Sequence, residues 1–168
     1  MTWNSLPFVL QSATMPQEKP LLTIGLPVFN SEKTIANALK SLANQTMADF
    51  TVLISDNCSN DRTPEIIKKH TASDARFRYF RQPRNIGARE NFRYVLNQAD
   101  TDFFMWAAAD DYWSPQFTEK NLEALKSNEN LVASVSRIQM GGFPSLPYKM
   151  QGTFPLRGDF SQRLSAYL

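Results

Sequence analysis

The chain is poor in the residues that build several common catalytic and metal sites. It has one cysteine, Cys58, and one histidine, His70, in 168 residues. A single cysteine excludes an internal disulfide and a multi-cysteine metal site, and it fits a reducing compartment, so we expect a cytoplasmic protein. His70 follows two lysines at what we interpret as an exposed helix end, which gives little support to a Ser/His/Asp triad.

Long apolar runs are also missing. No run approaches the roughly 20 residues that a helix needs to span a bilayer, so we expect no transmembrane segment. Residues 1–20 lack a basic start and contain only one short apolar piece, Leu6 to Leu10, which is not a convincing secretory signal. We interpret residues 1–20 as an N-terminal tail, and the sequence leaves open a peripheral association with a membrane.

The charge is close to balanced. Lys and Arg number 18 against 16 Asp and Glu, a net charge of +2, and the basic residues are scattered apart from one arginine series. This distribution is not that of a nucleic-acid surface, so we expect no nucleic-acid partner. Within the series, Arg84 and Arg89 flank a glycine-containing loop, which makes them candidates for binding a diphosphate. The alternative for the series is a set of solvated strand and helix faces.

Apolar runs alternate with helical patterns along most of the chain. Helical periodicity follows the runs, with breaks rich in Gly, Pro, Asn and Asp between them. This order predicts an α/β fold with a mostly parallel open sheet and helices on both faces. Pro27 is expected to take the end of the first strand out of the hydrogen-bonded ladder. The expected strands are Leu21–Phe29, Phe50–Ser55, Phe77–Phe80, Asp102–Ala107 and Leu131–Ile138.

Acidic residues end two of these strands. Ligands of open α/β sheets bind outside the carboxyl ends of the strands, where Asp56 can accept a hydrogen bond from a base or a ribose hydroxyl. Its alternative role is a turn or loop cap. Asp110 and Asp111 follow the fourth strand and offer hard oxygen ligands for Mn²⁺ or Mg²⁺ bridging phosphates, or else they cap the next segment.

Five short motifs then occur in order along the chain. They are Leu26-Pro27-Val28-Phe29-Asn30, Ala43-Asn44-Gln45-Thr46, Ser55-Asp56-Asn57 with the polar run to Thr63, Arg84-Asn85-Ile86-Gly87, and Ala109-Asp110-Asp111-Tyr112-Trp113. Together they resemble the family 2 glycosyltransferases with the GT-A fold, over about residues 21–138. The resemblance implies that Pro27, Phe29 and Asn30 flank the nucleotide and that Asp56 binds its base or ribose. It also implies that Asn85 and Gly87 lie beside the nucleotide and that Asp110 binds metal and diphosphate.

The resemblance implies a function as well as a fold. We expect a glycosyltransferase that binds a nucleotide-diphosphate sugar and transfers the sugar, with inversion, to a hydroxyl of a glycan or lipid-linked acceptor in polysaccharide biosynthesis. Residues 21–140 would form the nucleotide-sugar binding domain, and residues 141–168 a partial acceptor-side segment.

The chain departs from the family pattern at two places. Ala108 stands where the family has the first aspartate of its metal motif. The family also has an acceptor-side half with a catalytic base beyond the metal motif, and little of that half is expected in this sequence. Asp159 and Glu123 are available carboxylates, but neither has a context that marks it as the base. The alternative is therefore a truncated, catalytically inactive fragment that binds nucleotide.

Overall fold

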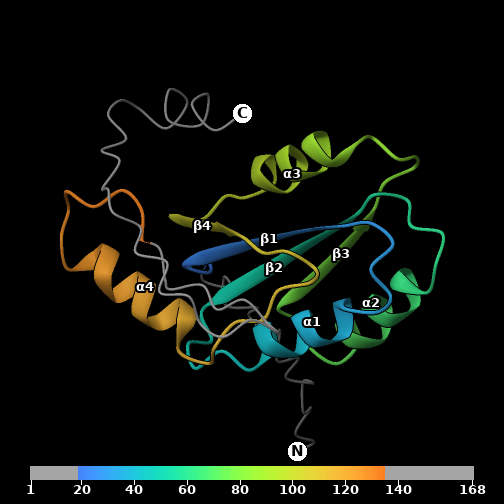
Figure 1. Ribbon diagram of the computed structural model, residues 1–168. Coiled ribbons are helices and arrows are strands. Elements are labelled where there is room, and N and C mark those ends of the chain that lie inside the picture. Colours follow the sequence, from blue (N-terminus) through green and yellow to red (C-terminus); the bar gives the residue numbers. More distant parts are fainter. Residues whose placement is uncertain (1–18, 135–168) are drawn as a thin grey trace, which may run out of the picture. The chain divides into compact units, whose positions relative to one another are not determined.

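The computed structural model describes residues 19–134 of the chain. Within these residues strands and helices alternate strictly, as the apolar runs and helical patterns predict (Figure 1). The elements are β1 (Leu22–Val28), α1 (Ile35–Ala43), β2 (Phe50–Asp56), α2 (Thr63–Thr71), β3 (Phe77–Arg81), α3 (Ala88–Asn97), β4 (Phe103–Trp106) and α4 (Phe117–Lys126).

The four strands form one parallel sheet in the order β3-β2-β1-β4. The α/β prediction with a parallel open sheet is therefore confirmed. Helix α3 packs against β1 and β2, while α2 packs against β3 on the opposite face of the sheet (Figure 1). Parallel strands need crossover connections, and the helical segments between these strands supply them.

The centre of the core lies in the two middle strands. Every residue of β1 is buried, and so is every residue of β2 except Thr51. Such continuous burial is expected where helices cover both faces, and it explains why both strands read as unbroken apolar runs. The edge strand β4 is less covered, since Trp106 retains 41% of its exposure.

Pro27 does not leave the ladder, and this prediction is wrong. It stays in β1 and pairs in register with Ser55 of β2. Residues of a parallel strand direct their backbone groups alternately to the two neighbouring strands, and the Gly25 carbonyl accepts Ala107 N–H on the β4 side. Pro27 therefore turns its N–H-free nitrogen toward β4, whose pairing with β1 has already ended at Gly25. The ladder loses no hydrogen bond there.

The fifth expected strand, Leu131–Ile138, is not formed where the structure describes it. Residues 131–134 have no strand assignment, and Leu131 and Val132 are 44% and 54% exposed. A β-branched and apolar composition alone does not make a strand when no neighbouring strand pairs with it. Residues 135–138 lie outside the described part, as do the expected tail and the segment 141–168.

The fold divides into two compact units. Of the described residues, the first contains 19–36 together with Asp49–Asp110, and the second contains Asn37–Ala48 and residues 111–134. All four strands, α2 and α3 belong to the first unit. None of the helices within residues 19–134 has the length and apolar content of a membrane span. The cytoplasmic location stays a prediction.

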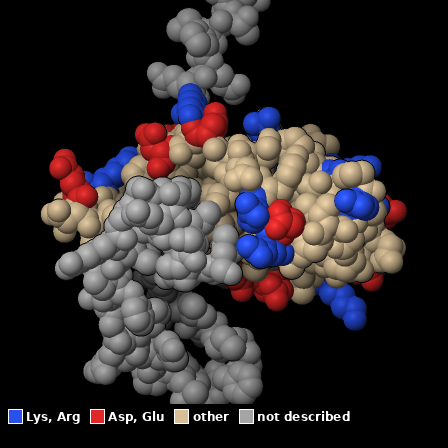
Figure 2. All heavy atoms as spheres, turned by 90° about the horizontal axis from the view of Figure 1, so that it is seen from above, with Lys and Arg blue, Asp and Glu red and all other residues tan. Residues whose placement is uncertain are grey.

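Charged side chains are dispersed over the face seen in Figure 2. Lys and Arg side chains lie there in several separate groups, with acidic side chains among them. On α3, the Arg93 guanidinium is 3.4 Å from the Glu90 carboxylate.

A glycine lets α3 approach the sheet closely. A Cβ atom added to Gly25 of β1 would lie 2.7 Å from side-chain atoms of both Phe104 and Val95. Real side chains do not tolerate such distances, so any larger residue forces the side chain of Phe104 or Val95, or the element that carries it, to shift. The position of α3 on the sheet therefore depends on the missing side chain at residue 25.

We predict that Gly25→Ala lowers the free energy of unfolding by about 1–3 kcal/mol, the usual cost of overpacking a core. Urea denaturation measures the loss. Adding Val95→Ala to this variant removes one of the two clashing groups, so the double variant should lose less than the sum of its single substitutions. Strict additivity of the two substitutions would contradict this account of the contact.

Candidate functional site

The loops after β1 and β2 are joined by side-chain hydrogen bonds to backbone groups. The Ser59 hydroxyl accepts the Asn30 N–H at 2.9 Å, and the Asn30 side-chain oxygen accepts the Asn60 N–H at 2.9 Å. A further bond runs from Ser31 N–H to the Thr63 hydroxyl at 2.7 Å. Asn30 adopts a positive φ of 48°, a conformation that asparagine tolerates better than most residues. These bonds hold the β1 loop in one arrangement.

Asp56 is the buried anchor of this loop pair. Its side chain is fully buried, and its two carboxylate oxygens accept the Ser59 N–H and the Tyr79 hydroxyl, each at 2.9 Å. The Arg81 guanidinium lies 3.9 Å away and provides an opposite charge. Asp56 thus has the loop-capping contacts that its sequence context also allowed, and in this structure its carboxylate is covered by the chain.

The Asn85–Gly87 turn is tied to the same loop. The Asn57 side chain donates to the Asn85 side-chain oxygen at 2.9 Å and accepts the Ile86 N–H at 2.8 Å. Asn85 in turn accepts the Gly87 N–H at 2.8 Å. Gly87 has a φ of 85°, a backbone conformation that favours glycine.

A pocket of about 610 Å³ opens beside the β1 loop in the first unit. It contains three of the residues that the sequence singled out, Pro27, Asn30 and Asp110, and it also contains Ala108. Its remaining lining residues are Ser31, Glu32, Lys33, Thr34, Asp61, Phe92 and Ala109. The pocket therefore lies beyond the carboxyl ends of β1 and β4, where ligands of open α/β sheets bind.

The other candidate residues lie outside this pocket lining. Phe29 is 46% exposed, and Arg84 and Arg89 are exposed on either side of the Gly87 turn. Asp56 is buried among the β2 loop residues. Asp111 is exposed and belongs to the second unit, whereas Asp110 belongs to the first.

Two acidic groups of the pocket are satisfied by the chain itself. Asp61 accepts the Glu32 N–H at 3.0 Å and the Thr63 N–H at 2.9 Å. Burial acts to raise the pKa of Asp61, but hydrogen bonds from Thr63 and Glu32 outweigh it and the pKa is lowered. Glu32 accepts the Arg62 backbone N–H at 3.1 Å and pairs with its guanidinium at 3.3 Å.

The residues present do not form a metal cage. No group of three or more His, Cys, Asp or Glu side chains suited to a metal ion occurs in the part of the chain that the structure describes. Ala108 lines the pocket with a methyl group where the family motif has an acid. Asp110 is therefore the one pocket carboxylate not already engaged by hydrogen bonds within residues 19–134.

Sequence reasoning missed several pocket residues. Glu32 and Lys33 stand between the β1 motif and the next helix, in a position that reads as an ordinary solvated helix start. Asp61 stands within the polar run that ends at Thr63, and the sequence around Phe92 shows only helical periodicity. The one available signal was spacing, since Glu32 and Lys33 follow Asn30 directly on the loop that the motif places beside the ligand.

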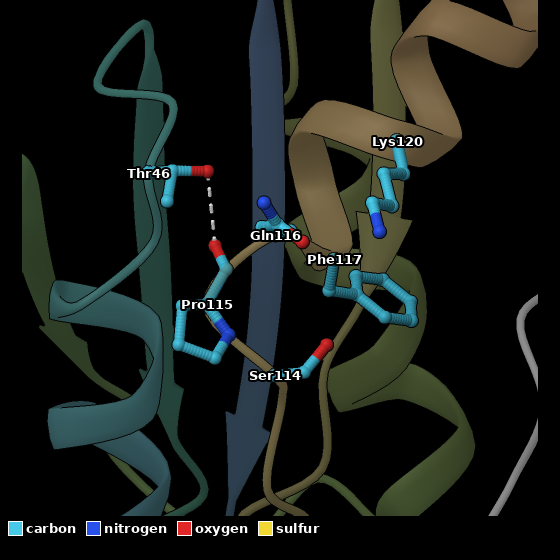
Figure 3. A pocket seen from close by; sticks show the side chains of 6 residues that line it. All are labelled: Thr46, Ser114, Pro115, Gln116, Phe117 and Lys120. Atoms are coloured by element: carbon cyan, nitrogen blue, oxygen red, sulfur yellow. Dashed lines mark hydrogen bonds between the residues drawn. The ribbon is translucent and has the colours of Figure 1, made fainter.

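A smaller hollow of about 380 Å³ occurs in the second unit. Figure 3 shows its lining by Thr46, Ser114, Pro115, Gln116, Phe117 and Lys120, with the Thr46 hydroxyl donating to the Pro115 carbonyl. Beside it the buried Gln45 side chain donates to Ser114 O at 2.8 Å and accepts the Thr118 N–H at 3.0 Å. The Gln45-Thr46 motif therefore has a structural role in this unit.

We predict that Gln45→Leu lowers the free energy of unfolding by about 2 kcal/mol, because it leaves the buried Thr118 N–H and the part-buried Ser114 carbonyl without their partner. Urea denaturation gives the difference. Asn44→Leu changes the neighbouring exposed residue and is the matched control. Equal losses in the two variants would show that the Gln45 contacts contribute nothing specific.

The Asp56 network also predicts an alkaline transition. Burial, together with the hydrogen bond and negative charge of Asp56, raises the pKa of Tyr79 to about 12. An unfolded tyrosine titrates near 10, so the stabilisation is complete below about pH 10 and is lost as the pH rises from about 10 to 12. Unfolding measured across this range should show a loss in the wild type that Tyr79→Phe lacks. Tyr112→Phe removes a 73% exposed ring and is the control, and an unchanged alkaline loss in Tyr79→Phe would refute the assignment.

Comparison with known proteins was consistent with this geometry. The family model for Glycosyl transferase family 2 matches residues 23–166. An uncharacterized glycosyltransferase of Methanocaldococcus jannaschii is 28% identical over 116 residues, which cover 68% of this chain and 40% of that protein. The GalNAc(5)-diNAcBac-PP-undecaprenol beta-1,3-glucosyltransferase of Campylobacter jejuni is 31% identical over 93 residues, covering 55% of this chain and 30% of that protein.

A solved structure shows the same fold. S. aureus TarS 1–349 in complex with UDP-GlcNAc superposes with a TM-score of 0.60 at 26% identity, covering 64% of this chain and 32% of that chain. The chain thus spans less than half the length of each of these three proteins. The GT-A expectation is confirmed by this fold. Because the family match extends over most of the chain, from residue 23 to residue 166, the protein belongs to the glycosyl transferase family 2.

Proposed function

We propose that this chain carries the donor-binding part of an inverting glycosyltransferase. The observation that carries the proposal is the pocket beyond β1 and β4, which joins Pro27, Asn30 and Asp110 in a family 2 chain. Its donor is a nucleotide-diphosphate sugar. The UDP-GlcNAc complex of TarS, at 26% identity, supports this donor class.

The proposed roles follow from position. Pro27 and Asn30 border the nucleotide, and Asp110 lies at the phosphate end of the pocket. Asp56 acts on the nucleotide through the loop that it holds, because its carboxylate orders Ser59 and Ser59 orders Asn30. Asn85 and Gly87 act in the same way, through their hydrogen bonds to Asn57 and to each other.

Phe29, Arg84, Arg89 and Asp111 remain candidates on exposed positions. We propose that the phenyl ring of Phe29 and the two guanidinium groups contact parts of the donor that project beyond the pocket. Guanidinium groups bind phosphate oxygens through paired N–H donors, which suits Arg84 and Arg89 to a diphosphate.

In the proposed reaction the acceptor hydroxyl attacks the anomeric carbon from the face opposite the diphosphate. The new bond from oxygen to carbon forms as the bond from carbon to the diphosphate oxygen breaks, and the hydroxyl proton passes to a base that we do not assign. The acceptor is a glycan or a lipid-linked saccharide. The undecaprenol-linked substrate in the name of the Campylobacter jejuni relative supports the lipid-linked class.

A second candidate is a nucleotide-binding domain that does not transfer sugar. Ala108 favours it, because the missing acid removes a group that the family motif places at the diphosphate. Incubation with labelled nucleotide-sugars and lipid-linked or oligosaccharide acceptors separates the two functions. Multiple turnover by the 168-residue chain would establish transfer, while nucleotide binding without turnover would support the second candidate.

We predict that UDP or GDP raises the melting temperature of the wild type by several degrees. A ligand at about one hundred times its Kd adds about 2.7 kcal/mol to the stability of the folded state. Ala108→Phe places a ring in the pocket and should abolish this shift. Ala75→Phe adds the same ring at an exposed position of the same unit and is the control.

Melting temperatures without ligand show whether either substitution disturbs the fold. Only a variant that melts close to the wild type is informative about the pocket. If neither UDP nor GDP shifts the wild type at millimolar concentration, the nucleotide site is not where we place it.

A further inference from the structure

The charges of the pocket provide the starting observation. Four ionisable side chains line it: Glu32, Lys33, Asp61 and Asp110. Glu32 is paired with Arg62, and Asp61 accepts two backbone N–H groups. Both carboxylates are therefore compensated by the chain itself and are poor candidates for binding a further cation.

Lys33 and Asp110 are the two charges that remain available. Within residues 19–134 neither side chain takes part in a hydrogen bond or an ion pair, and both are exposed. Among the residues that the structure describes, Lys33 is the only basic one that lines the pocket. Its ammonium group can bind an anion without breaking a hydrogen bond or ion pair within residues 19–134.

The diphosphate of the proposed donor needs compensating positive charge. A divalent ion supplies it where carboxylates hold the ion, and Mg²⁺ is usually bound through one or two carboxylates together with substrate phosphates. Here Ala108 contributes a methyl group and Asp110 is a single carboxylate. The pocket is thus short of metal ligands, and it contains a lysine, whose compact charge on a flexible stem suits phosphate binding.

We propose that Lys33 binds the diphosphate of the donor and that, as a result, nucleotide binding to this chain does not require a divalent cation. The proposal rests on the nucleotide-binding function proposed above. It assigns the Lys33 ammonium group a contact with the phosphate oxygens, at the end of the pocket where Asp110 lies.

Calorimetric titration of the full chain with UDP and GDP tests the assignment, once in EDTA and once in excess Mn²⁺. We expect the wild-type Kd to differ by less than about threefold between the two conditions. Lys33→Gln should raise the Kd in EDTA by about tenfold or more, the usual effect of losing a hydrogen bond to a charged group. Lys33→Arg should restore most of the affinity.

Two controls separate a phosphate contact from a structural effect. Lys68→Gln removes the same charge from an exposed position on α2 and should leave the Kd unchanged. Uridine and guanosine lack phosphate, so their weaker binding should be the same in wild type and Lys33→Gln. A loss of nucleoside binding in Lys33→Gln would show that the lysine shapes the loop instead, and would overturn the proposal.

The remaining outcomes are also decisive. Binding that disappears in EDTA and returns with Mn²⁺ would overturn the inference while leaving the nucleotide-binding function intact. So would equal effects of Lys33→Gln and Lys68→Gln. An absence of nucleotide binding in both conditions would remove the proposed function and this inference with it.

Discussion

The pocket depends on one buried carboxylate. Asp56 ends β2 with no exposed surface, and an isolated charge there would be strongly destabilising. The chain compensates it with the Ser59 N–H, the Tyr79 hydroxyl and the nearby Arg81 guanidinium. Because these partners come from the following loop and from β3, the carboxylate determines where that loop lies relative to the sheet.

Hydrogen bonds then connect the loop after β2 to the pocket. Ser59, which donates its N–H to Asp56, accepts the Asn30 N–H with its hydroxyl. Asn30 borders the pocket in a backbone conformation that few residues other than glycine adopt. Asp56, which has no exposed surface for a ligand to reach, thus influences the position of Asn30, which lines the pocket. This is why a strand-end aspartate can matter for binding whether or not it touches the nucleotide.

The sequence predicted the sheet well and the pocket only in part. Apolar runs located all four strands of the parallel sheet to within about two residues, because burial on both faces leaves a continuous apolar run. Pro27 can stay in β1 because β4 ends before it, and no local sequence pattern predicts where β4 ends. Periodicity also could not tell that Leu131 to Ser134 would find no strand to pair with.

The candidate site shows the same division. Motif order identified Pro27, Asn30 and Asp110, which the fold brings to one pocket. It did not identify Lys33, because a lysine at a helix start is normally a solvated residue and only the shape of the loop makes it a pocket residue. Which carboxylates are already satisfied is likewise a matter of tertiary hydrogen bonds. The amino-acid sequence alone does not show whether the carboxylates of Glu32 and Asp61 already accept hydrogen bonds from the chain.

The position of Phe92 in the pocket depends on Gly25 of β1, which has no side chain. Gly25 leaves room for Val95 of α3 and Phe104 of β4, and the Asn91 side chain of α3 bonds to Ser55 of β2 on the same face. These contacts hold α3 against the sheet at the residues on both sides of Phe92. The Trp106 indole donates to the Phe92 carbonyl at 3.3 Å, so Phe92 is held from β4 as well. Phe92, an apolar lining residue of the pocket, is thus attached to the core through α3 and β4, while the polar lining residues Asn30, Glu32 and Asp61 lie on loops that hydrogen bonds tie together.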